Sequence, residues 1–216
     1  MIKLVNVTKK IGKNIILNNI NVEFKPGCIY GLRGNNGSGK TMLMRSIAGL
    51  MKPTEGQIYI GDKLLYNDMD FPDSIGILIE NPSFIGNMRG LENLMLLASY
   101  FVDAPKDVAR EAMEKVGLNP DDKRKYSKYS LGMKQKLGVA AAIMGNPDII
   151  LLDEPINAID EEGVERVKDV LINLKKDKII IVACHDREEL DFLADKIYLI
   201  KEGHLYDEES YKVHRL

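Results

Sequence analysis

The stretch GNNGSGKT, residues 34–41, follows a short apolar run (Cys28 to Leu32) and precedes a segment with helical spacing. Its glycines allow a backbone path on which successive N–H groups point at phosphate oxygens. A helix that begins near Lys40 adds the positive end of its dipole. Lys40 can place a positive charge on the β- and γ-phosphates, and the Thr41 hydroxyl can bind Mg²⁺. The stretch therefore predicts a phosphate-binding loop between a strand and a helix.

The apolar pattern around this loop predicts an α/β protein. Ile149 to Leu152 and Ile179 to Ala183 are continuous apolar runs, which is typical of parallel strands covered on both faces. Ile2 to Val7 and Ile20 to Phe24 alternate apolar and polar residues like half-exposed strands. We expect a P-loop NTPase core with a parallel sheet and an N-terminal antiparallel β subdomain.

Two helical regions are expected as well. After the loop, Leu43, Ile47 and Leu50 share one helix face, and this helix should stop near Lys52 and Pro53. Residues 91–144 have a mostly helical pattern with two breaks. The chain is therefore predicted to be a single domain, 1–216, with an inserted α-helical subdomain at about 82–146.

Composition excludes several classes of protein. Lysine plus arginine is 30 and aspartate plus glutamate is 32, a net charge of -2, so nothing favours a nucleic-acid partner. Cys28 and Cys184 lie in apolar runs, which favours buried thiols in a reducing compartment over a redox or metal site. No apolar stretch approaches the roughly 18 residues that span a bilayer. We expect a soluble intracellular chain.

The segment IILLDEP, residues 149–155, should deliver two carboxylates to the edge of the sheet where ligands bind. Asp153 is the candidate partner of Mg²⁺. Glu154 is the candidate base that orients and polarises the attacking water, as phosphoryl transfer requires.

A second anion site is predicted in YSLGMKQKL, residues 129–137. Ser130 is placed to cap the helix that follows, and Gly132 lies in its first turn. An ordinary capped helix would have the same pattern. Beside a phosphate loop, however, a second anion site suggests two copies that face head to tail and share the nucleotide.

With these motifs the chain resembles the nucleotide-binding domain of ATP-binding cassette (ABC) transporters over almost its whole length. Residues 34–41 resemble the family's Walker A motif, residues 149–154 its Walker B motif and residues 129–133 its signature motif. Asn157 to Asp160 resembles the D-loop, and His185 stands where the family has a histidine that contacts the γ-phosphate. The resemblance implies that ATP is bound by Ile11, Gly34, Asn35, Asn36, Gly37, Ser38, Gly39, Lys40, Thr41, Met42, Ser130 and Gly132. It also implies catalytic roles for Lys40, Glu154 and His185, and Mg²⁺ ligands at Thr41, Glu80 and Asp153.

Four positions depart from the family's usual pattern. Glu80 replaces the usual Q-loop glutamine and adds a negative charge beside the metal, which could hold Mg²⁺ more firmly but also crowds the phosphates with like charge. Ile11 replaces the aromatic residue that stacks on adenine, so we predict that ATP is favoured over GTP by less than about tenfold. Leu131 and Met133 replace a glycine and a glutamine of the signature.

The Glu80-Asn81-Pro82 segment and the form of the signature resemble the subgroup that serves lantibiotic and bacitracin resistance. This implies an ATP-hydrolysing subunit that powers a separate transmembrane permease, exports a peptide, antibiotic or other small amphiphile, and pairs with a second nucleotide-binding subunit. Such a chain would be cytoplasmic and peripheral on the inner face of the cell membrane. The alternatives are a soluble ABC-type ATPase, for example in cluster assembly, and a simple P-loop kinase or GTP switch, which would not need Ser130.

Overall fold

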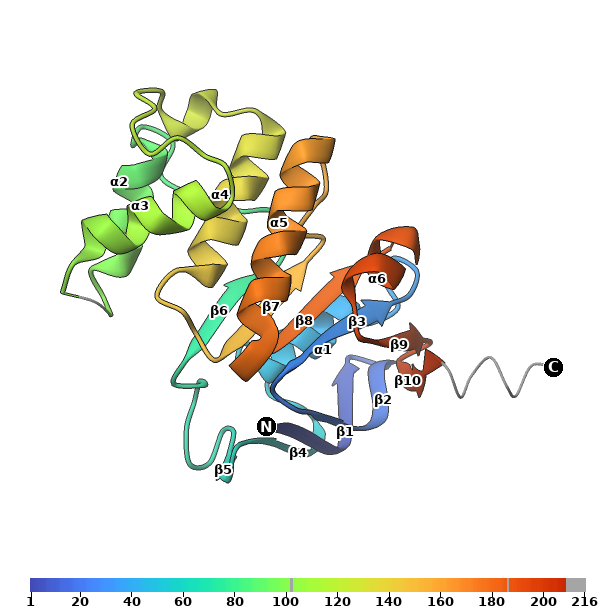
Figure 1. Cartoon of the computed structure of the whole chain (residues 1–216). Coiled ribbons are helices and arrows are strands. Elements are labelled where there is room, and N and C mark those ends of the chain that lie inside the picture. Colours follow the sequence, from blue (N-terminus) through green and yellow to red (C-terminus); the bar gives the residue numbers. More distant parts are fainter. Residues whose placement is uncertain (102, 186, 209–216) are drawn as a thin grey trace.

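The computed structural model describes residues 1–101, 103–185 and 187–208, and these form two sheets with helices around the larger one (Figure 1). The larger sheet has six strands in the order β10-β9-β3-β8-β7-β6. Its strands are β3 (Cys28–Arg33), β6 (Ile75–Leu78), β7 (Ile149–Asp153), β8 (Ile179–Cys184), β9 (Lys196–Lys201) and β10 (His204–Asp207). The strands from β9 to β6 are parallel, and only β10 is antiparallel to its neighbour.

The two central strands explain the apolar runs of the sequence. All residues of β7 and β8 are buried, because helices or the second sheet cover both faces. Residues that directly follow β3, β7 and β8 lie at one edge of the sheet, since these strands run in the same direction. The expected parallel core is therefore confirmed.

The second sheet is antiparallel, in the order β2-β1-β4-β5. Its strands are β1 (Ile2–Ile11), β2 (Asn14–Phe24), β4 (Glu55–Ile60) and β5 (Lys63–Leu64). β1 and β2 form one hairpin that is longer than the two short alternating runs predicted. Irregular pairing between Leu4 and Val7, together with a positive φ of 51° at Asn6, interrupts the simple alternation along β1.

The helices lie on both faces of the larger sheet and beyond its β6 edge. They are α1 (Lys40–Ile47), α2 (Gly90–Ala98), α3 (Pro105–Lys115), α4 (Leu131–Ile143), α5 (Glu161–Leu174) and α6 (Arg187–Leu193), with short 3-10 turns at Tyr126–Lys128 and Lys175–Asp177. In Figure 1, α2, α3 and α4 gather at the end of the molecule away from the antiparallel sheet. Among the described residues, no helix combines the length and the apolar character needed to cross a membrane.

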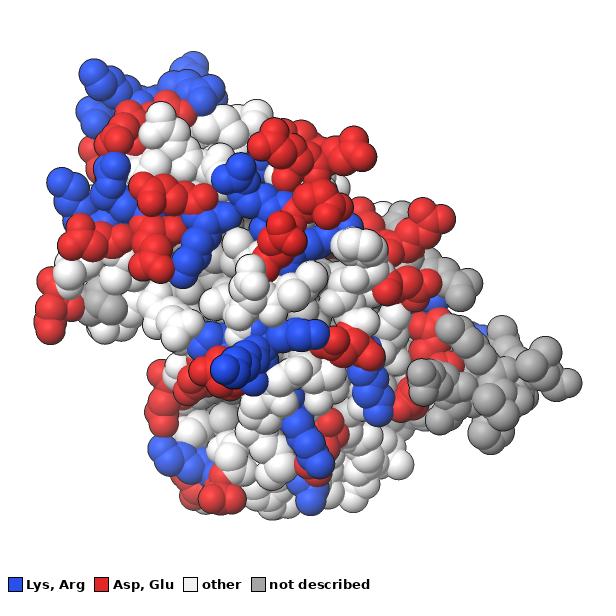
Figure 2. Space-filling view, viewed as in Figure 1, with Lys and Arg blue, Asp and Glu red and all other residues white. Residues whose placement is uncertain are grey.

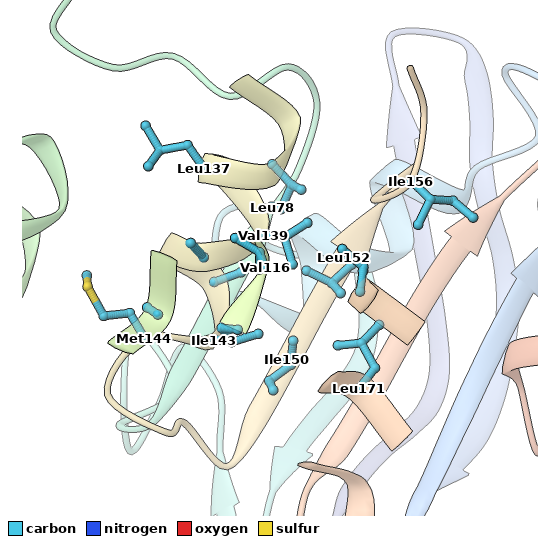
Figure 3. Close-up of a cluster of buried hydrophobic side chains, with 14 of the residues drawn as sticks. Leu78, Val116, Leu137, Val139, Ile143, Met144, Ile150, Leu152, Ile156 and Leu171 are labelled. Atoms are coloured by element: carbon cyan, nitrogen blue, oxygen red, sulfur yellow. The ribbon is translucent and has the colours of Figure 1, made fainter. Parts of the chain in front are cut away.

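A continuous apolar core joins α4 to the sheet. Figure 3 shows Val139 and Ile143 of α4 on the side that faces Ile150 and Leu152 of β7, whereas Leu137 lies on the opposite side of α4. Because α4 packs directly on β6 and β7, the segment before its first residue is held at a defined position relative to the strand ends.

The helix after the phosphate loop is shorter than predicted. It ends at Ile47, and Leu50 is 53% exposed rather than part of the buried face. Gly49 has a φ of 79° and its N–H donates to the Ser46 carbonyl, so a left-handed glycine ends the helix before Pro53 is reached.

Candidate functional site

The phosphate loop connects β3 to α1 and is packed too closely for larger residues. A side chain on Gly34 would lie 2.3 Å from the Ile200 carbonyl oxygen, and Gly39 adopts a φ of 114° next to the Ile16 carbonyl oxygen. Lys40 is buried, and its Nζ donates to the carbonyl oxygens of Gly34 (2.6 Å) and Asn35 (3.4 Å). The ammonium group is therefore held within the concave side of the loop.

One polar atom of the loop is buried without a partner in the part of the chain described. The Ser38 hydroxyl has no hydrogen bond, although its oxygen is shielded from solvent. A buried hydroxyl of this kind costs free energy unless a ligand satisfies it. The loop borders a cavity of about 460 Å³ whose lining consists of Ile16, Asn35, Asn36, Gly37, Ser38, Gly39, Lys40, Thr41, Met42, Glu80, Asp153 and Glu154. This volume and these polar groups suit a nucleotide phosphate tail.

Oxygen donors meet at the floor of this cavity. The Thr41 hydroxyl donates to Asp153 Oδ2 at 2.6 Å, which joins the start of α1 to the end of β7. Burial raises the pKa of the Asp153 carboxyl, and the nearby charges of Glu154 and Glu80 raise it further, against the opposing effects of Thr41 and Lys40. Carboxylates beside a hydroxyl have the donor chemistry of a Mg²⁺ site.

Glu80 lies at the same cavity but is engaged elsewhere. Its Oε1 accepts a hydrogen bond from Nη2 of Arg45 at 2.6 Å, and both side chains are partly exposed. Glu80 also has a φ of 64°, which is uncommon for a residue with a side chain. The carboxylate predicted to bind the metal is thus paired with a helix α1 arginine that the sequence reading did not consider.

Glu154 and His185 lie together, at the ends of the adjacent strands β7 and β8. His185 Nδ1 is 2.9 Å from Glu154 Oε2. Glu154 has a φ of 50°, its N–H donates to the Ala183 carbonyl, and its own carbonyl accepts a hydrogen bond from Gln135 Nε2 at 2.7 Å. A left-handed conformation of a residue with a side chain costs about 1 kcal/mol, so these two backbone hydrogen bonds hold it in place.

Ser130 caps α4 as predicted, since its hydroxyl accepts from the Met133 N–H at 3.2 Å. It lines a separate cavity of about 440 Å³ with Leu131, Gly132, Met133, Lys136, Ala158 and Asp160. A smaller cavity of about 270 Å³ adjoins both, sharing Glu154 with the first and Leu131 with the second. Among the described residues, none lines both the phosphate-loop cavity and the Ser130 cavity.

The sequence matches a known family at these motifs. Residues 17–157 match the ABC transporter family, a stretch that includes the phosphate loop, Ser130 and Glu154. The chain belongs to the ABC transporter family. As a cassette of that family it binds and hydrolyses ATP, and the expected P-loop fold is confirmed.

Curated relatives support this membership across nearly the whole chain. The cassette is 44% identical to the uncharacterized ABC transporter ATP-binding protein YybJ of Bacillus subtilis over 97% of each chain. It is 38% identical to the bacitracin transport ATP-binding protein BcrA of Enterococcus faecalis, covering 96% of this chain and 68% of BcrA. It is 33% identical to the lantibiotic transport ATP-binding protein SrtF of Streptococcus pyogenes, covering 98% of this chain and 91% of SrtF. The expected resemblance to bacitracin and lantibiotic transport proteins is confirmed.

A solved cassette has the same fold. The dimeric, post-hydrolysis structure of the ATP-binding cassette MJ0796 with bound ADP and Pi superposes with a TM-score of 0.85 at 29% identity, over 96% of this chain and 98% of that one. Related cassettes therefore form dimers and act in transporters.

Gly132 of this cassette is required by packing within the chain. A side chain on Gly132 would lie 2.6 Å from the Ala158 carbonyl oxygen. Lys136, one turn further along α4, forms an ion pair with Asp160 at 2.7 Å. The segment Asn157 to Asp160, which resembles a D-loop, is thus fastened to the first turns of α4.

Sequence reasoning placed the adenine contact at Ile11 and missed three other residues. Ile11 is 49% exposed at the β1–β2 turn and does not line the cavity, whereas Ile16 does. Arg45 and Gln135 were also missed. No motif marks Ile16 or Arg45, and Gln135 lies in the stretch YSLGMKQKL without a predicted role, because each contacts the site only through the three-dimensional packing of α1, α4 or β2.

Proposed function

We propose that this cassette is the energy-supplying subunit of an exporter whose cargo is a peptide antibiotic or a similar small amphiphile. The support is its similarity to BcrA and SrtF, which are named for bacitracin and lantibiotic transport. The permease would be a separate polypeptide, and the cassette would lie on the cytoplasmic face of the membrane against it. The soluble ABC-type ATPase is disfavoured, because these relatives are transport proteins.

The phosphate loop is proposed to hold the β- and γ-phosphates of ATP. Nζ of Lys40 would exchange the carbonyl oxygens of Gly34 and Asn35 for phosphate oxygens. The buried Ser38 hydroxyl would gain its missing partner in the same step. Lys40 would then pair its positive charge with an anion, and Ser38 would gain a charge-assisted hydrogen bond in place of none.

The donor set on the floor of the cavity fits Mg²⁺. Thr41 and Asp153 already share a hydrogen bond, and burial together with the neighbouring carboxylates destabilises the negative charge of Asp153. These two residues would hold the ion, which supplies charge neutralisation for the phosphates. Glu80 would join them after releasing Arg45, so its contribution depends on breaking that ion pair.

The contact between Glu154 and His185 is the observation that supports their proposed roles in hydrolysis. Glu154 Oε2 accepts from His185 Nδ1 at 2.9 Å beside the cavity that contains the phosphate loop. Glu154 would orient a water molecule and accept its proton. The His185 ring, held through Nδ1, would donate a hydrogen bond from Nε2 to the γ-phosphate, which requires a proton on both ring nitrogens. Charge that develops on the phosphate would also be stabilised by Lys40 and the loop N–H groups.

A second nucleotide-binding subunit is proposed to complete each site. Ser130 and Gly132 lie at a capped helix N-terminus with an adjoining cavity, yet that cavity has no lining residue in common with the phosphate-loop cavity. In a head-to-tail pair, the α4 N-terminus of one copy would face the nucleotide of the other. Residues 82–146, which contain α2 to α4, would move as the helical subdomain that contacts the permease.

The test is Glu154→Gln, which keeps the size of the side chain and removes the base. We expect this variant to bind ATP, to hydrolyse it at least about 100-fold more slowly, and to accumulate as a dimer on a sizing column. Ser130→Arg should bind ATP as a monomer and lose activity. Turnover by Glu154→Gln at the parental rate would refute the assignment of the base.

A further inference from the structure

Three kinds of ligand atom gather beside Glu154. The Cys184 thiol, the His185 imidazole and the Glu154 carboxylate each place an atom within 4.8 Å of the other two. Cys184 Sγ lies 3.5 Å from Glu154 Oε2, and His185 Nδ1 lies 2.9 Å from the same oxygen. Sulfur, nitrogen and oxygen donors therefore converge at the ends of β7 and β8.

A fourth donor is adjacent on helix α6. The Cys184 thiol donates to Glu189 Oε2 at 2.8 Å. Because Cys184 is buried and His185 is exposed, an ion would approach from the His185 side and reach the thiol last. The sequence alone favoured a buried, inert thiol, but it could not show that two carboxylates and an imidazole surround it.

The spacing suits a small tetrahedral ion. Zinc binds at about 2.0 Å to nitrogen or oxygen and about 2.3 Å to sulfur, so neighbouring ligand atoms of a tetrahedral site lie roughly 3.3 to 3.5 Å apart. The S···O distance of 3.5 Å to Glu154 already matches, while the N···O pair at 2.9 Å and the S···O pair to Glu189 at 2.8 Å must open. This adjustment would require rotation of the Glu154, His185 and Glu189 side chains.

The donor types also separate this cluster from the Mg²⁺ site. Thr41 and Asp153 offer only oxygen, which hard ions prefer. A cysteine sulfur beside a histidine nitrogen favours zinc and similar thiophilic divalent ions over Mg²⁺. The two groups share the end of β7 but contain different residues.

We propose that Cys184, His185 and Glu154 form a binding site for a thiophilic divalent cation such as Zn²⁺ in the nucleotide-free cassette, with the Glu189 carboxylate turning from its present contact with the thiol to become the fourth donor. On binding, Sγ of Cys184 and Nδ1 of His185 each form a bond to the metal. The S–H bond breaks and the thiol proton passes to solvent, while the neutral imidazole carries its proton on Nε2, with no change of oxidation state. The ion would occupy Glu154 and His185, so it would stop hydrolysis without blocking the phosphate loop. This inhibitory consequence, unlike the binding itself, rests on the proposed function.

Binding is tested directly with Zn²⁺ and the full chain, freed of any affinity tag and of nucleotide. Competition with a chromophoric chelator should show one Zn²⁺ per chain. Cys184→Ala and His185→Ala should each weaken the affinity at least about tenfold, since even the loss of a residue that only supports a ligand has an effect of this size. The matched controls are Cys28→Ala, at the opposite end of the neighbouring strand β3, and His204→Ala in β10.

Two further measurements complete the test. Co²⁺ in place of Zn²⁺ should give a thiolate charge-transfer band that disappears in Cys184→Ser, a variant that keeps a hydrogen-bond donor toward Glu189 and so guards against misfolding. Buffered Zn²⁺ at constant Mg²⁺ should inhibit the parental ATPase and spare Cys184→Ser, with ATP binding unchanged. Weak binding by the parent, or affinity that survives in Cys184→Ala, would overturn the proposal. Normal turnover by Glu154→Gln would instead refute the assigned base and leave the chelator and Co²⁺ results to decide the metal site.

Discussion

Replacing Gln135 with methionine should slow hydrolysis without weakening ATP binding. Gln135 is 7% exposed, and its Nε2 donates to the carbonyl oxygen of Glu154 at 2.7 Å. Methionine has a similar length but cannot donate. The substitution therefore removes one of the two backbone hydrogen bonds that hold Glu154 at its φ of 50°.

The size of the effect follows from that hydrogen bond. A buried carbonyl that loses its donor costs about 1–3 kcal/mol. If the left-handed conformation of Glu154 is destabilised by this amount, kcat falls by about 5- to 150-fold, since about 1.4 kcal/mol corresponds to a factor of ten. Lys40 and the loop are untouched, so the dissociation constant for ATP should stay within about twofold.

Steady-state phosphate release at saturating ATP gives kcat, and titration with a fluorescent ATP analogue gives the dissociation constant. Gln57→Met is the matched control, because Gln57 is exposed on β4. A Gln135→Met protein that folds normally and keeps its kcat would refute the reasoning. Equal losses in kcat and in ATP affinity would do so as well, since they would indicate a general disturbance of the site.

Two further substitutions test the charge and the packing of the site. Burial raises the pKa of Asp153 above its ordinary value of 3.8, so the folded state holds this proton more tightly than the unfolded chain, and stability falls as pH rises from that value through the raised one. Asp153→Asn should therefore raise the thermal unfolding temperature of the nucleotide-free protein at pH 7, and this increase should disappear below about pH 4. An equal increase at both pH values would show that the buried negative charge is not its cause. A side chain on Gly76 would lie 1.7 Å from the Ala142 carbonyl oxygen, so Gly76→Ala should lower the free energy of unfolding in urea by about 3 kcal/mol, whereas Gly86→Ala, which has room, should change it little.

The grouping of the site's main residues followed from strand direction alone. β7 and β8 are parallel neighbours, so Asp153, Glu154 and His185 had to meet at one edge once both apolar runs were recognised as buried strands. The phosphate loop comes directly after β3, the next strand of the same sheet, which brings Thr41 to Asp153. Local pattern and the rules of parallel sheets were sufficient for this much.

The supporting residues could not be found in this way. Gln135 reaches Glu154 because α4 packs on the sheet, and Arg45 of α1 reaches Glu80 in the segment after β6. Such contacts depend on the angle and depth at which a helix packs, and no periodicity in the sequence encodes those quantities. The early end of α1 was missed for a different reason. Gly49 is itself a helix-stop signal, but the end of the helix was predicted from Pro53 instead.

Ser130 caps the N-terminus of helix α4, and Gln135 follows five residues later, about 7.5 Å along the helix axis. If Ser130 contacts the nucleotide of the opposite subunit, then helix α4 connects the γ-phosphate of that nucleotide to the Glu154 carbonyl of its own subunit. Loss of the γ-phosphate at one site would shift α4 and, through Gln135, the Glu154 carbonyl of the second site. The two ATP molecules of a dimer would then be hydrolysed in turn rather than independently, because α4 couples the two sites.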